Sequence, residues 1–127
     1  MEDEQLKAAH AMRRAMLGDA YVDGMTSDPD LVATEFQHYI TSMAWGVWAR
    51  GDEVFSPRDR SLLVLAMTAA LGRIEEFTLH ASATPRTGVT DAELDELCFQ
   101  VAAYCGAPAA LAARRGVKAA RVKRDLE

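Results

Sequence analysis

Three side chains suited to acid–base chemistry lie close together near the middle of the sequence. Arg73, Glu76 and His80 are spaced i, i+3 and i+7, so on a single helix they would share one face. A cation, a carboxylate and an imidazole on one face can bind an acidic substrate and move a proton. The alternative is an exposed helix end with an Arg73–Glu76 ion pair and a histidine that has no role, because such surface pairs are common and weak.

The preceding residues predict the helix that would hold these side chains. The stretch from Arg58 to His80 reads RDRSLLVLAMTAALGRIEEFTLH, and its first half is apolar on every face, as in a helix enclosed by protein. At its start, Ser56 can cap the helix, Pro57 suits the first helical position and Asp59 favours the helix dipole. Small domains with wholly apolar helices often finish burying them against a second copy, so a homo-oligomer is expected.

Helical periodicity also covers most of the remaining sequence. Further helices are expected over residues 4–17, from Ser27 or Asp28 to Gly51, from the capping-box residue Thr90 to Gly106, and from Pro108 onward. The segments 19–30 and 82–88 contain Gly and Pro and predict loops. No run alternates with period two, so no strand is expected. The prediction is an all-α fold of five to six helices, with residues 1–127 forming a single domain.

Composition limits the classes of function. The chain has 127 residues, half of them hydrophobic, and a net charge of -5 at pH 7. An acidic protein of this kind is not expected to bind nucleic acid or an anionic membrane. The N-terminus MEDEQLK is acidic where a signal peptide would be basic, and the longest apolar run, Leu62–Leu71, is too short to span a bilayer. A cytoplasmic protein is expected.

Cysteines and histidines do not form a metal-binding pattern. Cys98 and Cys105 are seven residues apart in the sequence, which on a helix is about 10 Å and beyond disulfide reach. The three histidines are scattered at positions 10, 38 and 80, so zinc spacing is absent. Buried free thiols and no metal are expected. Six of the fourteen basic residues fall between Arg114 and Arg124, which in an acidic chain predicts a solvated helix face or a salt-bridging surface.

Several short motifs occur in an order and spacing that resemble the carboxymuconolactone decarboxylase family. They are WG followed by W-x-R in residues 34–50, R-x-R-S-L and E-x-x-x-H in residues 58–80, and Y-x-G-x-P in residues 88–110. With LGDAYVD (17–23), the resemblance covers nearly the whole chain. It implies an all-helical subunit in a ring-like homo-oligomer, usually a hexamer.

The activity implied by the resemblance is a decarboxylation without metal or organic cofactor. The small anionic lactone 4-carboxymuconolactone loses CO₂ to give 3-oxoadipate enol-lactone, in the protocatechuate branch of the β-ketoadipate pathway. Peroxidase-like members of the family carry C-x-x-C ahead of the histidine, where this sequence has Arg73 and Glu76 and no cysteine. Disulfide exchange needs a thiolate pair, so redox activity is excluded.

This reaction needs groups that bind carboxylates, a donor to the developing oxyanion and a source of a proton. His80 suits the donor or the general acid, while Glu76 either orients and charges the imidazole or donates the proton itself. Arginine can bind a carboxylate through two parallel N–H bonds. The candidates are Arg50, Arg58, Arg60 and Arg73. Each of them could instead be a partner in a structural ion pair. Candidates for the pocket wall, or for ordinary core packing, are Trp45, Trp48 and Tyr104.

Two histidines and two loops leave alternatives open. His38 is expected to be a surface or packing residue, or to reach a pocket across a subunit interface, and His10 to be structural. The loops RGDEVFS (50–56) and ASATPRTG (81–88) differ from the family pattern, and loops shape pockets. The alternative functions are therefore a non-catalytic oligomeric binding homologue, and a same-fold enzyme that acts on another lactone or keto-acid.

Overall fold

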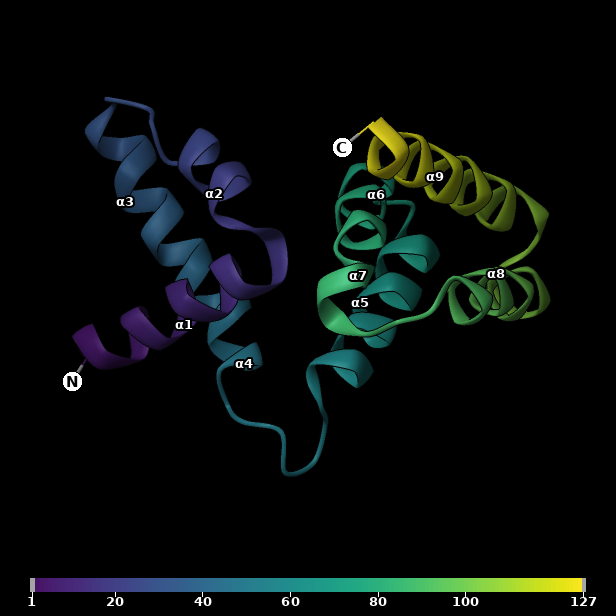
Figure 1. Cartoon of the computed structure of the whole chain (residues 1–127), viewed down its shortest axis with the longest axis horizontal. Helices are drawn as coiled ribbons and strands as arrows, with labels where there is room; N and C mark the ends of the chain where they lie inside the picture. The colour runs from purple at the N-terminus through teal and green to yellow at the C-terminus, as the bar shows by residue number, and fades with distance from the viewer. Residues whose placement is uncertain (1, 127) are drawn as a thin grey trace. The chain divides into compact units, whose positions relative to one another are not determined.

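The computed structural model describes residues 2–126, and most of this range is helical. No strand occurs among the described residues, which confirms the predicted all-α class, but the helices outnumber the five to six expected. In chain order (Figure 1) they are α1 (Glu2–Leu17), α2 (Asp19–Met25), α3 (Leu31–Ile40), the π-helical turn η1 (Thr41–Trp45), α4 (Gly46–Trp48), α5 (Pro57–Leu71), α6 (Ile74–Ser82), α7 (Thr84–Thr87), α8 (Asp91–Cys105) and α9 (Ala107–Leu126).

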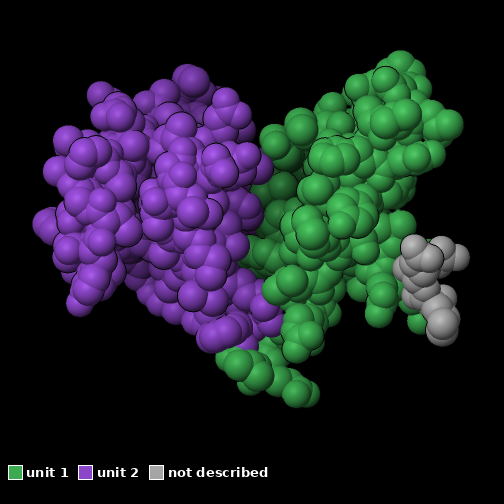
Figure 2. All heavy atoms as spheres, turned by 180° about the vertical axis from the view of Figure 1, so that it is seen from behind, with its two compact units in different colours: residues 1–54 green, residues 55–127 purple. Residues whose placement is uncertain are grey.

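The chain separates into two compact units, which Figure 2 shows in different colours. Unit 1 is Met1–Val54 and carries α1 to α4, and unit 2 is Phe55–Glu127 and carries α5 to α9. Each unit buries its own apolar side chains. Those of unit 1 include Val22, Trp45 and Trp48, and those of unit 2 form a cluster that includes Leu65, Phe77 and Leu94.

Unit 1 is organised around α1, which packs against α2, η1 and α4. The buried indoles of Trp45 and Trp48 lie side by side, with ring centroids 4.9 Å apart. The guanidinium of Arg13 is also buried and donates a hydrogen bond of 3.1 Å to the hydroxyl of Thr41. Because a buried charge is costly without such a partner, this bond helps to fix α1 against η1.

Two predictions for unit 1 are wrong. Residues 19–25 form α2 rather than a loop, because Val22 is anchored in the core and outweighs the low helix propensity of the glycine in this segment. The next helix is capped by Asp30 and not by Ser27 or Asp28. The Asp30 carboxylate accepts hydrogen bonds from the backbone amides two and three residues later, which satisfies donors at the start of α3.

Unit 2 places α6 against both α5 and α9, while α8 also packs against α5 and α9. Gly116 allows α9 to pack closely against α6. A Cβ atom at this position would lie 2.8 Å from Cδ1 of Phe77 and 2.9 Å from Oγ1 of Thr78. The close packing of α6 against α9 therefore depends on the lack of a side chain at Gly116.

Helix starts in unit 2 follow the capping signals of the sequence. The Ser56 hydroxyl accepts from the Asp59 amide and the Asp59 carboxylate accepts from the Ser56 amide, both at 3.1 Å. Thr90 and Glu93 form the same reciprocal capping box, at 3.1 and 3.0 Å. The predicted starts of α5 and α8 are confirmed.

The stretch from Arg58 to His80 is not one helix. Gly72 adopts a left-handed conformation with φ of 72° and ends α5, as a residue without Cβ can do without strain. Arg73 then serves as the N-cap residue of α6 and has non-helical backbone angles. The prediction that it shares a helix face with Glu76 and His80 is therefore wrong, and only the last two lie on α6.

Within the described chain, α5 is also less enclosed than predicted. Leu65 is fully buried, whereas Leu63, Met67 and Leu71 are exposed by 39%, 59% and 70%. These last three residues are spaced i, i+4 and i+8 and form one exposed stripe, called here the α5 apolar face. The helix is apolar all round, but only one side of it packs into the core and the opposite side is exposed.

Basic residues of α9 form the predicted salt-bridging surface against α8. Arg114 and Arg121 contact the carboxylate of Asp95 at 2.6 and 3.0 Å. Arg124 contacts the carboxylate of Asp91 at 3.0 Å. Exposed pairs of this kind each contribute little to stability, but together they join the C-terminal helix to its neighbour.

Smaller differences concern the loop before α8 and the end of that helix. Residues 82–88 contain the short helix α7, which Pro85 favours because proline suits the first turn of a helix. Cys98 is buried as predicted, whereas Cys105 is exposed at the last position of α8. Among the described helices, none combines the length and the apolar composition needed to cross a membrane.

Candidate active site

The E-x-x-x-H pair lies on α6, which is anchored through its apolar side. Glu76 and His80 are four residues apart, so they lie one turn apart on the same side of the helix. Phe77 and Ala81 directly follow them and are buried in the core that α6 shares with α9. Burial of Phe77 and Ala81 fixes the rotation of α6 about its axis. It therefore also fixes the direction in which Glu76 and His80 project from the helix.

His80 lies mostly within the protein. Burial lowers the pKa of its imidazole to about 4, because the cationic form loses hydration, and the nearby Glu76 carboxylate offsets only part of this effect. His80 is therefore neutral at neutral pH. A neutral imidazole presents one N–H donor and one acceptor nitrogen.

Glu76 and Arg73 are both exposed, so the carboxylate of Glu76 remains hydrated while it acts on His80 through its charge. Arg14, Arg58, Arg114, Arg121 and Arg124 form ion pairs with other carboxylates. The Arg73–Glu76 ion pair of the alternative interpretation is not among them.

The arginines of the R-x-R-S-L motif are engaged by neighbouring side chains. The Arg58 guanidinium forms ion pairs with Asp59 and Glu93, so it joins the first turns of α5 and α8. The Arg60 guanidinium lies over the ring of Phe55, 6.0 Å from its centroid. Glu93 also belongs to the capping box of α8, and because it lies on a different helix from Arg58, no local motif indicates that the two side chains pair.

Aromatic candidates are divided between the units. Trp45 and Trp48 are buried against each other in unit 1, which fits core packing. Tyr104 is exposed by 84% on α8 of unit 2. His10 and His38 come together in unit 1, with Nε2 of the first 3.3 Å from Nδ1 of the second. Of the predicted site residues, the structure thus brings Glu76 and His80 together on one element.

A neutral, poorly hydrated N–H group next to a hydrated carboxylate has a definite chemical capacity. The N–H group can stabilise an oxyanion, since a donor that is already in place needs no reorganisation when charge develops. The carboxylate can orient the imidazole and exchange protons with water. The arrangement therefore suits a reaction in which negative charge moves onto an oxygen atom and a proton is then taken up.

The chain belongs to the carboxymuconolactone decarboxylase family. Residues 34–119 match the family, and this range includes all of α6 with Glu76 and His80. The chain is 38% identical over 116 residues to a 4-carboxymuconolactone decarboxylase of Acinetobacter baylyi, which covers 89% of this chain and 84% of the relative. It is 32% identical over 112 residues to a nitrosuccinic acid decarboxylase of Metarhizium robertsii, covering 87% of this chain and 74% of the relative.

Both relatives are decarboxylases, and the family match includes the helix with the acid–base pair. The protein is a carboxy-lyase. The match from residue 34 to residue 119 also takes in parts of both units.

Proposed function

We propose that the protein decarboxylates 4-carboxymuconolactone to 3-oxoadipate enol-lactone without a cofactor, in the cytoplasm and as a step of protocatechuate catabolism through the β-ketoadipate pathway. The observation that carries the proposal is the neutral, mostly buried His80 one turn from Glu76. The 38% identity to a 4-carboxymuconolactone decarboxylase supports the choice of substrate.

The substrate contains its own electron acceptor. The departing carboxylate is bonded to a saturated ring carbon next to a C=C bond, and this C=C bond is conjugated with the lactone carbonyl. When the C–C bond to this carboxylate breaks, its electron pair enters the conjugated system and CO₂ leaves. The resulting furanolate carries its charge largely on the carbonyl oxygen. Protonation of the carbon next to that carbonyl gives the enol-lactone.

His80 is the proposed donor to this oxygen. Its neutral imidazole can direct an N–H group at the developing oxyanion in poorly hydrated surroundings, where a hydrogen bond to a charged acceptor is strong. Glu76 is exposed, so we assign it the orientation of the imidazole and the relay of a proton from water to the carbanion.

Carboxylate binding is assigned first to Arg73. Its guanidinium is exposed at the start of α6, and the described chain engages it in no ion pair, unlike that of Arg58. Arginine can hold a carboxylate through two parallel N–H bonds, which fixes the orientation of an anionic substrate. Arg58, Arg60, Trp45 and Tyr104 remain proposed substrate contacts of lower rank.

We further propose that both units form one carboxymuconolactone decarboxylase-like domain that assembles into a homo-oligomer, a hexamer by family resemblance. The match over residues 34–119 spans parts of both units and supports the single domain. The α5 apolar face supports assembly, since three large apolar side chains on one stripe remain uncovered in the described chain.

A second candidate substrate is a nitro-substituted dicarboxylic acid, because one relative is a nitrosuccinic acid decarboxylase. Nitrosuccinic acid also carries two carboxyl groups, and its nitro group can accept the electron pair of a departing carboxylate. The demands on the site are the same as for the lactone. They are an anion-binding cation, a donor to a developing oxyanion and a proton.

Loss of 4-carboxymuconolactone absorbance, with the lactone generated in situ, tests the function in purified wild-type protein and two variants. His80→Ala is expected to abolish turnover, and Glu76→Gln to reduce it strongly, because glutamine keeps the size of the side chain but carries no exchangeable acid proton. Circular dichroism and sedimentation should match the wild type. If the folded wild-type protein turns over nitrosuccinate but not the lactone, nitrosuccinate becomes the proposed substrate. If it turns over neither compound, the proposed function is refuted.

A further inference from the structure

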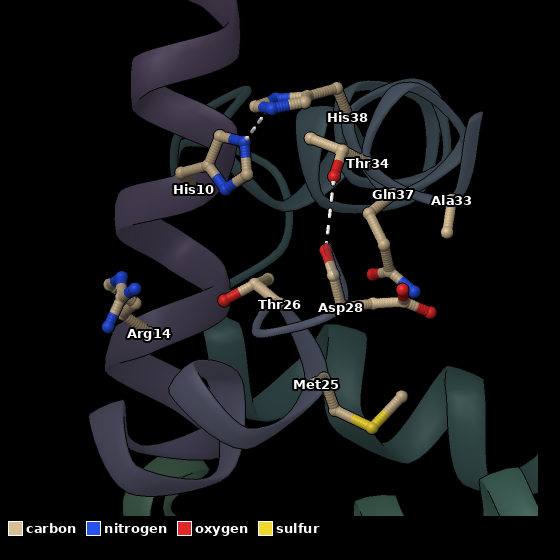
Figure 3. Close-up of a pocket in the computed structure, with 9 residues that line it drawn as sticks. All are labelled: His10, Arg14, Met25, Thr26, Asp28, Ala33, Thr34, Gln37 and His38. Carbon is tan, nitrogen blue, oxygen red and sulfur yellow. Dashed lines mark hydrogen bonds between the residues drawn. The ribbon is translucent and has the colours of Figure 1, made fainter. Parts of the chain in front are cut away.

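Unit 1 contains a cavity of about 330 Å³ that the proposed decarboxylation does not use. It lies between α1 and α3, above the chain segment that joins α2 to α3 (Figure 3). His10 projects into it from α1 and His38 from α3, and both imidazoles lie together at one end. Asp28 lies at a distance from them, at the lower side of the cavity in Figure 3.

The two imidazoles share one hydrogen bond. Nε2 of His10 and Nδ1 of His38 are 3.3 Å apart, and the rings meet edge to face with centroids 5.2 Å apart. In a neutral pair one of these nitrogens donates to the other. The two outer nitrogens, Nδ1 of His10 and Nε2 of His38, then comprise one N–H donor and one acceptor, whichever ring donates. Addition of one proton to the pair makes both outer nitrogens donors.

Charges near His10 favour an anion over a cation. Burial lowers the pKa of His10, and the charges on His38, Arg13 and Arg14 lower it further, so the neighbours that act on this imidazole are all basic. Arg14 is itself paired with Asp19 and Asp23 of α2, at 3.1 and 2.8 Å. Among the described residues no three His, Cys, Asp or Glu side chains gather where they could hold a metal ion.

The remaining lining determines the shape of an acceptable anion. Met25 and Ala33 offer apolar contact, and the Gln37 amide is a further N–H donor. Asp28 places a carboxylate on the side away from the imidazoles, where a second negative charge would be repelled. A ligand with one carboxylate and an apolar body therefore fits the cavity, with its carboxylate at the imidazoles and its apolar body against Met25 and Ala33.

We propose that this cavity binds a small monocarboxylate, which accepts N–H groups from the His10–His38 pair and places its apolar body against Met25 and Ala33. The neutral pair already offers one N–H donor to the carboxylate. A bound negative charge beside the imidazoles also favours their protonated form, so binding is coupled to uptake of a proton. It also ties α3 to α1. This contact matters for α3 because none of its own side chains is buried.

Histidine C–H resonances in NMR spectra of the full chain test the proposal, because only three histidines are present. Benzoate is the probe, with isophthalate as the dicarboxylate and benzyl alcohol as the uncharged analogue. Benzoate should shift the resonances of His10 and His38 saturably at millimolar concentrations, and should raise the pKa of His10 by at least one unit. Isophthalate should bind at least tenfold more weakly, benzyl alcohol should give no saturable shift, and the resonance of His80 should remain in place.

Two variants separate the cavity from the exposed surface. Ala33→Phe fills the apolar part without altering an imidazole and should weaken benzoate binding at least tenfold. Tyr39→Ala is the matched control on α3, since Tyr39 is exposed by 65% and does not line the cavity, and it should bind as the wild type does. The proposal is overturned if benzoate up to 50 mM leaves both resonances unchanged, if isophthalate binds equally well, or if Ala33→Phe binds normally.

Discussion

Acidification should destabilise the protein through His80, and the effect can be worked out from its burial. The folded protein lowers the pKa of this imidazole from 6.5 to about 4. The unfolded chain therefore binds a proton on His80 at a higher pH than the folded protein does. The stabilisation is fully present above pH 6.5 and is lost as the pH falls toward 4.

The size of the effect follows from the two pKa values. Between pH 7.5 and pH 5, protonation of the unfolded state at His80 should lower the free energy of unfolding by about 2 kcal/mol. Below pH 4 the loss should level off at about 3 kcal/mol, because both states are then protonated. Glu76 already limits the effect, since its negative charge favours the protonated imidazole.

Urea unfolding followed by circular dichroism at fixed protein concentration measures this loss. Carboxylates and His10 also titrate in acid, so the informative quantity is the difference between the wild type and His80→Gln, in which the side chain stays neutral. The variant should lose about 2 kcal/mol less than the wild type between pH 7.5 and pH 5. Parallel loss in both proteins, together with an NMR pKa of His80 near 6.5, would refute the assignment of a buried neutral imidazole.

Two further substitutions test the packing within each unit, also by urea unfolding. Gly116→Ala places a Cβ within 3 Å of Phe77 and Thr78; overpacking of about 2–3 kcal/mol exceeds a helix-propensity gain of about 1 kcal/mol, so a net loss of about 1–2 kcal/mol is expected. Equal or higher stability would contradict the close α6–α9 contact. Thr41→Val removes the acceptor of the buried Arg13 and should lower the free energy of unfolding by about 1–3 kcal/mol, whereas an unchanged value would show that this bond is dispensable.

The starts of α5 and α8 were predictable from the sequence because their signals are local. The capping boxes at Ser56 and Thr90 each depend on a residue three positions later, so both were predicted correctly. The helix end at Gly72 was missed although glycine is the usual residue for such an end, because the apolar pattern continues across it. The start of α2 was missed because its stability comes from burial of Val22, which sequence periodicity in a short segment does not reveal.

The candidate site could be predicted only in part. Spacing was enough to place Glu76 and His80 one turn apart, since four residues make about one helical turn. The low pKa of His80 could not be predicted, because it results from burial in the fold and not from any neighbour in the sequence. The ion pair of Arg58 with Glu93 could not be predicted either, because Glu93 lies on another helix and local motifs do not show which helices meet.

In the proposed reaction, the charge of the substrate changes the state of the site. His80 is neutral in the free protein because burial disfavours its cation, and the single carboxylate of Glu76 is too weak a counter-charge to reverse this. A substrate with two carboxylates adds negative charge near the imidazole of His80 and so raises its pKa. Departure of CO₂ then removes one carboxylate as a neutral molecule and leaves its electron pair on the oxygen that faces the donor. A dianionic substrate therefore strengthens the hydrogen-bond donor that faces its developing oxyanion, because an imidazole closer to protonation donates more strongly, and a neutral lactone would not have this effect.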